Sequence, residues 1–343
     1  MAQNNKIQIL STKFPPPCKM PDLDYPITPK ENLKMVFEHK VPVWLPNTNR
    51  DMQSTAPVTD MAHPPMGQSG KDWFGQSWEW VDQVGGHMIA ADSWKITEME
   101  DWENQLVIPD LDKFDFSVGA EEAEARIDRD RMVRYQMSST MFERMLDLAE
   151  PVDAMCFLAS EPESAKKFFD TIADFRIKLI DKLVDEWIPI DIITLSDDWG
   201  TQLSSFISPE MYDALIFPGI KRIYEHVRSK GMYCALHSCG NIGNLVPYFS
   251  RLDFAFWEAQ SNNDLIALKE QFGDKINFRL IFNRPLMETP GVTDEEVDAS
   301  IHEFVTTMGK GGGCLANIWS PDPHVYTHTI QEMYRFSKEY YAR

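Results

Sequence analysis

Long hydrophobic runs, positive charge and cysteine are all scarce in this sequence, and each scarcity excludes a class of protein. No apolar run approaches the roughly 18 residues that a membrane-spanning helix needs, so no membrane segment is expected. The first residues, Met-Ala-Gln-Asn-Asn, do not resemble a signal peptide, so a cytoplasmic location is predicted. The chain of 343 residues has 33 Lys and Arg against 53 Asp and Glu, a formal net charge of -20. This balance argues against nucleic acid as a partner, because phosphate contacts need an excess of basic side chains.

Cysteine is present, but five residues are an odd number for a disulfide framework. Free thiols or metal ligands in a reducing compartment are therefore expected. We interpret Cys18, Cys156 and Cys234 as small apolar residues. Nucleotide-binding motifs are missing as well: no Gly-x-Gly-x-x-Gly follows an early strand, and there is no Walker A sequence. A dinucleotide-binding fold is therefore not predicted.

The sequence does contain a regular alternation of short apolar segments and amphipathic segments. Strands are expected at 41–46, 133–137, 190–195, 233–237, 253–256, 276–281 and 314–318, and helices at 29–38, 162–186, 209–230, 294–308 and 323–341. Such alternation implies parallel strands joined by helical crossovers. With the chain length, it predicts an α/β fold of the (β/α)8 TIM barrel type with a helical extension. Residues 1–32 are polar and rich in proline and are predicted to be an N-terminal arm, and residues 33–343 a single barrel domain.

Polar residues that follow barrel strands face the active site of such a fold. The candidates of this kind are Asp197, Asp198, His237, Cys239, Glu258, Gln260, Asn283 and Cys314. Aromatic residues near early strands either pack in the core or wall a pocket for a flat substrate. The aromatic candidates are Trp44, Trp73, Phe74 and Tyr135.

His237 and Cys239 are two residues apart, so in an extended chain their side chains point the same way and suit one metal ion. A His-x-Cys pair alone is a weak signal. Cys314, in a glycine-rich strand, would complete a His/Cys/Cys set with one open position, which is typical of a catalytic zinc site. Glu258 is expected either as a fourth ligand or as a support behind the ligands. Asp197 and Asp198 follow an apolar strand, and either one holds substrate or supplies a proton, or caps a helix.

These residues resemble motifs of the uroporphyrinogen decarboxylase superfamily over roughly residues 30–343. The matching stretches are Val41-Pro42-Val43-Trp44, Ser196-Asp197-Asp198-Trp199-Gly200, Ser208-Pro209-Glu210 and His237-Ser238-Cys239-Gly240-Asn241. Within the superfamily the chain is more similar to the corrinoid-dependent methyltransferases than to the decarboxylase. Decarboxylases have an arginine-rich loop after the first strand, whereas here that loop contains only Arg50. The zinc methyltransferases follow their His-x-Cys pair with a distant cysteine, at the spacing that separates Cys239 from Cys314.

The resemblance implies a zinc enzyme with His237, Cys239 and Cys314 as ligands. One implied reaction moves a methyl group from a methoxylated aromatic donor to the Co(I) corrinoid of a partner protein. Another moves a methyl group from methyl-Co(III) to a zinc-bound thiol. We predict the first, an O-demethylation, in which Asp197 or Asp198 orients or protonates the donor. Gln260 and Asn283, together with the four aromatic candidates, are predicted to bind the substrate.

Three alternatives remain open at this stage: the thiol methyltransferase, a true uroporphyrinogen decarboxylase, and a non-catalytic corrinoid- or metal-binding protein. The sequence does not fix the oligomeric state, and a homo-oligomer is one option.

Overall fold

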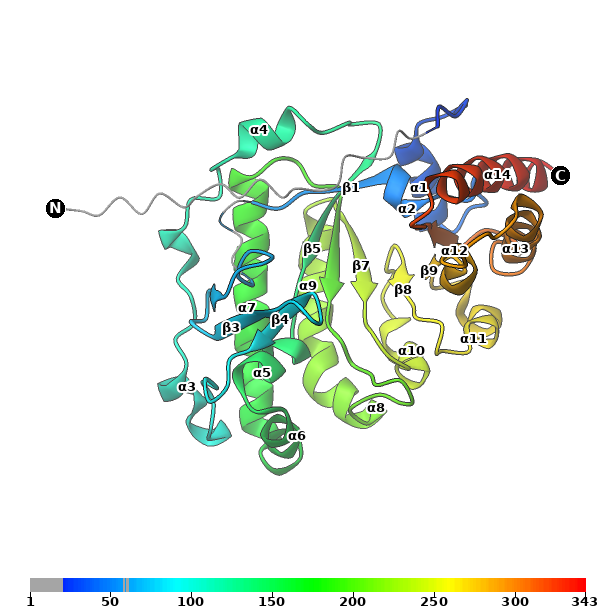
Figure 1. Ribbon diagram of the computed structural model, residues 1–343. Coiled ribbons are helices and arrows are strands. Elements are labelled where there is room, and N and C mark those ends of the chain that lie inside the picture. Colours follow the sequence, from blue (N-terminus) through cyan, green and yellow to red (C-terminus); the bar gives the residue numbers. More distant parts are fainter. Residues whose placement is uncertain (1–20, 58, 60–61) are drawn as a thin grey trace.

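The computed structural model describes residues 21–57, 59 and 62–343. Seven strands form one curled parallel sheet in the order β1-β5-β6-β7-β8-β9-β10, with helices packed around it (Figure 1). The strands are β1 (Met52–Ser54), β5 (Met132–Met137), β6 (Ile192–Ser196), β7 (Tyr233–His237), β8 (Trp257–Glu258), β9 (Phe278–Ile281) and β10 (Cys314–Asn317). The fold is thus α/β and resembles a TIM barrel, as the alternation in the sequence predicted.

A single β-bridge to β10 takes the place of the strand expected at 41–46. Asn47 pairs in parallel with Ala316 of β10, and the Ala316 N–H donates to the Pro46 carbonyl at 2.8 Å. The one-turn helix α2 (Thr48–Asp51) then separates this bridge from β1. The strand expected at 41–46 does not form, and Pro42 and Pro46 explain why, because proline lacks the N–H that a ladder needs. The strand expected at 253–256 forms instead as β8, just after it.

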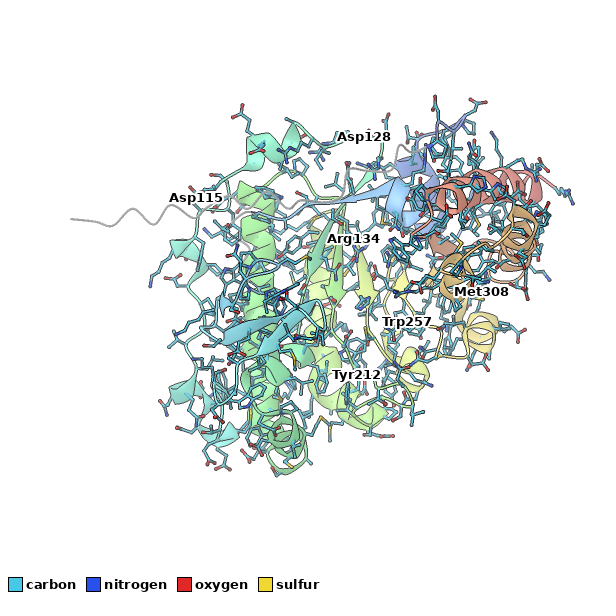
Figure 2. All side chains as sticks on the ribbon, viewed as in Figure 1. Asp115, Asp128, Arg134, Tyr212, Trp257 and Met308 are labelled. Carbon is cyan, nitrogen blue, oxygen red and sulfur yellow. The ribbon has the colours of Figure 1, made fainter. Side chains whose placement is uncertain are left out.

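Helices cover the outer face of the sheet, and side chains fill the space between the layers (Figure 2). The longer ones are α1 (Pro29–Phe37), α6 (Pro151–Ser160), α7 (Pro162–Glu186), α9 (Phe217–Ser229), α11 (Leu265–Phe272), α13 (Asp294–Thr306) and α14 (Pro323–Tyr341). The short ones are α3 (Trp102–Gln105), α4 (Ala120–Glu124), α5 (Phe142–Leu148), α8 (Pro209–Met211), α10 (Val246–Phe249) and α12 (Arg284–Met287), with 3-10 turns at Met99–Asp101, Leu111–Lys113 and Gly243–Leu245 and a π-helical turn at Tyr212–Ile216. None of the helices in the described ranges is long and apolar enough to cross a bilayer.

Helix α1 closes one end of the barrel. It begins at Pro29, where the sequence predicted, because Thr28 and Glu31 form a capping box. Its Leu33, Val36 and Phe37 belong to a buried cluster with residues at or near the starts of several strands. The amino-terminal end of the barrel is therefore plugged with apolar side chains, and its other end is left for polar residues. Residues 1–20 of the predicted arm lie outside the described residues.

A small antiparallel sheet, β2 (Gly70–Lys71), β3 (Ser77–Val81) and β4 (Gly86–Ile89), is inserted between β1 and β5 in the chain. Its hairpin turns at Gly85, whose φ of 61° suits glycine. The ion pair between Asp72 and Arg144, 2.6 Å long and fully buried, ties this insertion to α5.

Candidate active site

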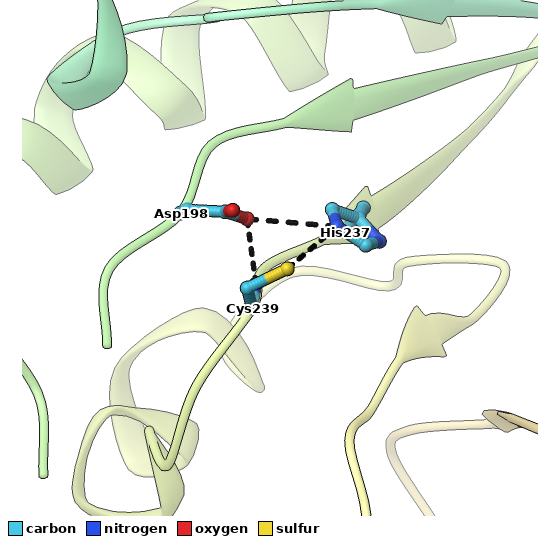
Figure 3. A group of neighbouring side chains, drawn as sticks. All are labelled: Asp198, His237 and Cys239. Carbon is cyan, nitrogen blue, oxygen red and sulfur yellow. Dashed lines mark hydrogen bonds and ion pairs between the residues drawn. The ribbon is translucent and has the colours of Figure 1, made fainter. Parts of the chain in front are cut away.

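Three side chains that can ligate a metal meet where β6 and β7 end. Asp198 follows β6, His237 is the last residue of β7, and Cys239 comes two residues later (Figure 3). Their ligand atoms all lie within 4.8 Å of one another. The Nε2 atom of His237 is 3.5 Å from Sγ of Cys239 and 3.5 Å from Oδ1 of Asp198. All three residues are partly buried, so an ion here would be enclosed by protein and still reachable by a substrate.

Two glycines allow the loops after β6 and β7 to meet. Gly240 has a φ of 88°, and a Cβ atom there would lie 2.2 Å from the carbonyl carbon of Gly200. The Asn241 N–H donates to the Thr201 carbonyl at 2.7 Å across the same contact. Beside it, the Cys239 N–H donates to Oδ1 of Asp198 at 2.6 Å. The close approach of two backbones therefore sets the distance between Asp198 and Cys239.

Glu258 supports the imidazole of His237 from behind. Its Oε2 lies 2.8 Å from Nδ1 of His237, so Nδ1 carries the proton and the Nε2 lone pair faces Cys239 and Asp198. Two guanidinium groups also contact this carboxylate: Arg134 at 2.6 Å on Oε1 and Arg279 at 2.9 Å on Oε2. Burial by itself would raise the pKa of Glu258, but the His237 hydrogen bond and the two arginine charges outweigh it and lower the pKa to about 2.

Among the described residues, Glu258 is not in the set whose ligand atoms meet at this site. Its contacts with His237, Arg134 and Arg279 suit it to the second role expected for it, a support behind the imidazole. Gln260 lies beside Asp198, His237 and Cys239: its Oε1 accepts the Gly240 N–H at 2.8 Å, and its amide partly offsets the rise in the pKa of the Cys239 thiol.

Burial and the neighbouring Asp198 carboxylate raise the pKa of the Cys239 thiol to about 12. A divalent cation reverses this effect, because a metal-bound thiol is deprotonated. One imidazole, one thiolate and one carboxylate together balance a charge of +2 and leave a position open, so the donor set fits a catalytic zinc ion.

Glu143 is a further acidic residue beside Asp198, and it was not among the residues predicted from the sequence. It lies in the first turn of α5, and burial followed by the charges of Asp198 and Asp197 raises its pKa well above the ordinary range. A raised pKa favours the protonated form of this carboxyl group, which suits it to donate a proton. The available signal was weak, because Glu143 sits inside a helix and does not directly follow a strand.

Asp197 has a structural role. It is fully buried and accepts the backbone N–H groups of Met141, Phe142 and Glu143 at 2.9–3.1 Å, as well as Nε1 of Trp199 at 2.7 Å. It thus caps the start of α5 from another element of the fold. Of the two aspartates, Asp198 is the one that the structure brings to His237 and Cys239.

Replacing each aspartate by asparagine separates these roles. Asp197→Asn is expected to destabilise the protein by roughly 2–3 kcal/mol, because an amide cannot accept all four donors. Asp198→Asn is expected to change stability by less than about 1 kcal/mol, because the side chain is partly exposed (32%), but to weaken metal binding at least about tenfold. Urea unfolding and metal titration of both variants measure this contrast. Equal loss of stability in the two would contradict the assignment.

The structure corrects the prediction for Cys314. This residue opens β10 and pairs in register with Phe278, which pairs with Trp257. All three face the helices, in the same buried cluster as Leu236. His237 pairs with Glu258 one position further along, on the inner face. Because successive residues of a strand point to opposite faces, the side chain of Cys314 lies on the other face of the sheet from those of His237 and Glu258. The third residue that lies with His237 and Cys239 is Asp198, and not Cys314 as predicted.

The same alternation separates Tyr135 from the site. Tyr135 belongs to the cluster that faces the helices, whereas its neighbours Arg134 and Gln136 face inward and contact Thr194 and Ser196. Asn283 is exposed, caps α12 and donates to Ser300, so it also lies apart from the group.

The three other aromatic candidates pack elsewhere. Trp44 stacks on Tyr25 with ring centroids 4.6 Å apart, beside Tyr334 of α14. Trp73 and Phe74 both pack edge-on against Phe175 of α7. Their burial is explained by core packing, the alternative that the sequence left open.

Comparison with known proteins confirms the predicted resemblance for the part of the chain that carries the site. Residues 141–279 match the uroporphyrinogen decarboxylase family, URO-D. None of the curated proteins matches the chain. Among solved structures, a methyltransferase from Methanosarcina mazei superposes with a TM-score of 0.61 at 13% identity, over 90% of this chain and 99% of that chain, which shows a shared fold. The 3-keto-D-glucoside 4-epimerase from E. coli gives a TM-score of 0.38 at 12% identity, over 63% of this chain and 84% of that chain.

Proposed function

We propose that this chain, which matches the uroporphyrinogen decarboxylase family over residues 141–279, is a metal-dependent methyltransferase. The observation that carries the proposal is the convergence of Asp198, His237 and Cys239 at the carboxyl end of a parallel sheet, with Glu258 fixing the imidazole. The shared fold with a methyltransferase supports it. The three residues would hold zinc, which supplies a Lewis acid when bound.

The ligand set favours a donor that loses its methyl group from oxygen. A His/Cys/Cys set contains two thiolates and makes a soft, weakly acidic metal, suited to activating a thiol. In the set proposed here, the carboxylate of Asp198 stands in place of one of these thiolates, because it is Asp198 that lies with His237 and Cys239. This harder set would make a bound metal a stronger Lewis acid, which would suit an oxygen leaving group. We therefore retain the aryl methyl ether as donor and the Co(I) corrinoid of a partner protein as acceptor.

The residues of this chain then have separate tasks in the reaction. In this reaction the methyl carbon would leave the ether oxygen for cobalt. The Co(I) corrinoid would supply the electron pair of the new bond and so become Co(III), and the oxygen would keep the pair of the broken bond and need a proton. Glu143 lies beside Asp198, and its raised pKa suits it to donate that proton. Glu258 keeps the Nε2 atom of His237 turned toward Cys239 and Asp198. Gln260 accepts the Gly240 N–H and so stabilises the turn after Cys239.

The test combines metal content with a spectroscopic assay of methyl transfer. The purified chain is assayed for zinc and mixed with a Co(I) corrinoid protein and a panel of methoxylated aromatics while the cobalt spectrum is recorded. About one zinc per chain with loss of the Co(I) band supports the proposal. Zinc with demethylation of methyl-Co(III) by a thiol would favour the thiol methyltransferase instead. Turnover of uroporphyrinogen without metal would favour the decarboxylase.

Two cysteine variants identify the ligands. Cys239→Ala is expected to reduce bound zinc from about one per chain to a small fraction, because it removes one of three ligands. Cys314→Ala is the matched control: it removes a buried thiol across the sheet and is expected to retain zinc. Zinc content by mass spectrometry of both proteins measures this. Loss of zinc from the Cys314 variant alone would contradict the assignment.

A further inference from the structure

Two arginines converge on one carboxylate inside the barrel. Arg134 comes from β5 and Arg279 from β9, and both contact Glu258. The side chains are nearly buried, with 9% of Arg134 and 13% of Arg279 exposed. Figure 2 shows Arg134 at the centre of the molecule. The decarboxylase-type arginine loop is absent from the sequence, but the fold assembles an arginine pair from strands that lie far apart in the chain.

The other partners of this arginine pair are neutral. Nε of Arg134 donates to Oγ1 of Thr194 at 2.8 Å, and Nη2 also donates to the Gln136 amide oxygen. Nε of Arg279 donates to Oγ1 of Thr48 at 2.9 Å. Within the described part of the chain, Glu258 is the sole carboxylate paired with either guanidinium, and Nη1 of Arg134 and Nη2 of Arg279 donate to no protein acceptor.

The charges of this group do not balance. Guanidinium groups stay protonated, so two positive charges face one negative charge. Asp198 and the Cys239 thiolate do not supply the missing anion, since they balance a bound divalent metal. One positive charge is left over in a nearly buried place, where an unpaired charge is costly.

We propose that Arg134 and Arg279 bind a single carboxylate group of the substrate and so position it beside the metal. Glu258 joins the two sites, because one of its oxygens contacts both His237 and Arg279. The methyl donor is thereby a methoxylated aromatic monoacid, and a neutral ether is disfavoured. This identification of the donor rests on the proposed methyl transfer, whereas the carboxylate site itself does not. One surplus charge matches one carboxylate and not the many of uroporphyrinogen.

The test compares the binding of 3-methoxybenzoate and 3-methoxybenzamide by calorimetry, with the zinc-loaded chain and no corrinoid protein. The two probes share their shape and differ in charge. We expect the benzoate to bind about 10- to 100-fold more tightly, because hydrogen bonds between charged groups are the strong ones. Equal binding of the two probes, or no binding of the benzoate, would overturn the proposal.

Single variants locate the effect. Arg134→Gln and Arg279→Gln each leave one arginine to pair with Glu258, so the fold and the zinc content are expected to persist while the preference for benzoate falls at least about tenfold. Arg129→Gln, at an exposed ion pair with Glu124, removes the same charge far from the barrel interior and is expected to keep the preference. A preference that survives in both interior variants would contradict the site.

The outcomes for this site and for the proposed reaction are independent. Selective benzoate binding without methyl transfer supports the carboxylate site and contradicts the reaction. Methyl transfer from neutral ethers as fast as from methoxybenzoates supports the reaction and overturns the carboxylate site.

Discussion

Gly240→Ala is expected to abolish metal binding and to destabilise the protein by several kcal/mol. The alanine Cβ would lie 2.2 Å from the carbonyl carbon and oxygen of Gly200, and backbone atoms cannot move aside as the end of a flexible side chain does. The φ of 88° adds a conformational cost of about 1 kcal/mol or more for any residue with a Cβ. The loops that carry Asp198 and Cys239 must then separate, which takes the two ligands apart.

Gly231→Ala is the matched control for this variant. Gly231 also has a positive φ, 78°, but a Cβ there meets nothing within 4 Å. Gly231→Ala is therefore expected to lower the free energy of unfolding by only the conformational cost of the positive φ, about 1 kcal/mol, and to bind zinc normally. Urea unfolding and zinc titration of the two variants give the comparison. If Gly240→Ala bound zinc as well as Gly231→Ala, the close approach of the loops would not be what holds the ligands together.

Glu258→Gln is expected to reduce the free energy of unfolding by about 3–5 kcal/mol and zinc affinity by roughly 10- to 100-fold. The amide leaves two nearly buried guanidinium groups without an anion, and removal of one partner of a buried ion pair is strongly destabilising. It also removes the acceptor that holds the Nδ1 proton of His237, and loss of such a support weakens metal binding.

Glu332→Gln is the control for Glu258→Gln. Glu332 also pairs with a histidine and an arginine, His302 at 3.1 Å and Arg335 at 2.6 Å. Arg335 is 56% exposed, however, and regains water when the pair is lost. This variant is therefore expected to lose less than about 1 kcal/mol and to bind zinc normally. Equal losses of stability in the two glutamate variants would show that leaving Arg134 and Arg279 without an anion costs no more than leaving the exposed Arg335 without one.

The pKa of Glu258 gives this pair an acid dependence of known sign. The pKa is lowered in the folded protein, to about 2, from its ordinary value of 4.5. The stabilisation is therefore complete above about pH 4.5 and is lost as the pH falls toward 2. Other carboxylates with lowered pKa values, such as Asp112 and Glu186, titrate in both proteins. Unfolding of the zinc-free protein across this window is therefore expected to show a steeper acid-linked loss of stability in the wild type than in Glu258→Gln.

The sequence by itself determined the order of the elements and two of the three residues that meet at the candidate metal site. Helix α1 starts at Pro29 because Thr28 and Glu31 cap it locally, and such signals act within a few residues. His237 and Cys239 share a face because they are two apart at the end of one strand. The alternation of apolar and amphipathic segments required parallel strands and helical crossovers wherever the chain folds.

Only the tertiary structure decided what surrounds those two ligands. Strand register set Glu258 and Arg279 beside His237 and turned Cys314 and Tyr135 toward the helices, since a shift of one residue moves a side chain to the other face of a sheet. No local signal in a sequence fixes that register. The choice of Asp198 over Asp197 depended on which carboxylate α5 takes as its cap, and α5 comes from a different part of the chain. Strand register and the capping of α5 both depend on contacts between segments that are distant in the sequence, and such contacts form only in the folded chain.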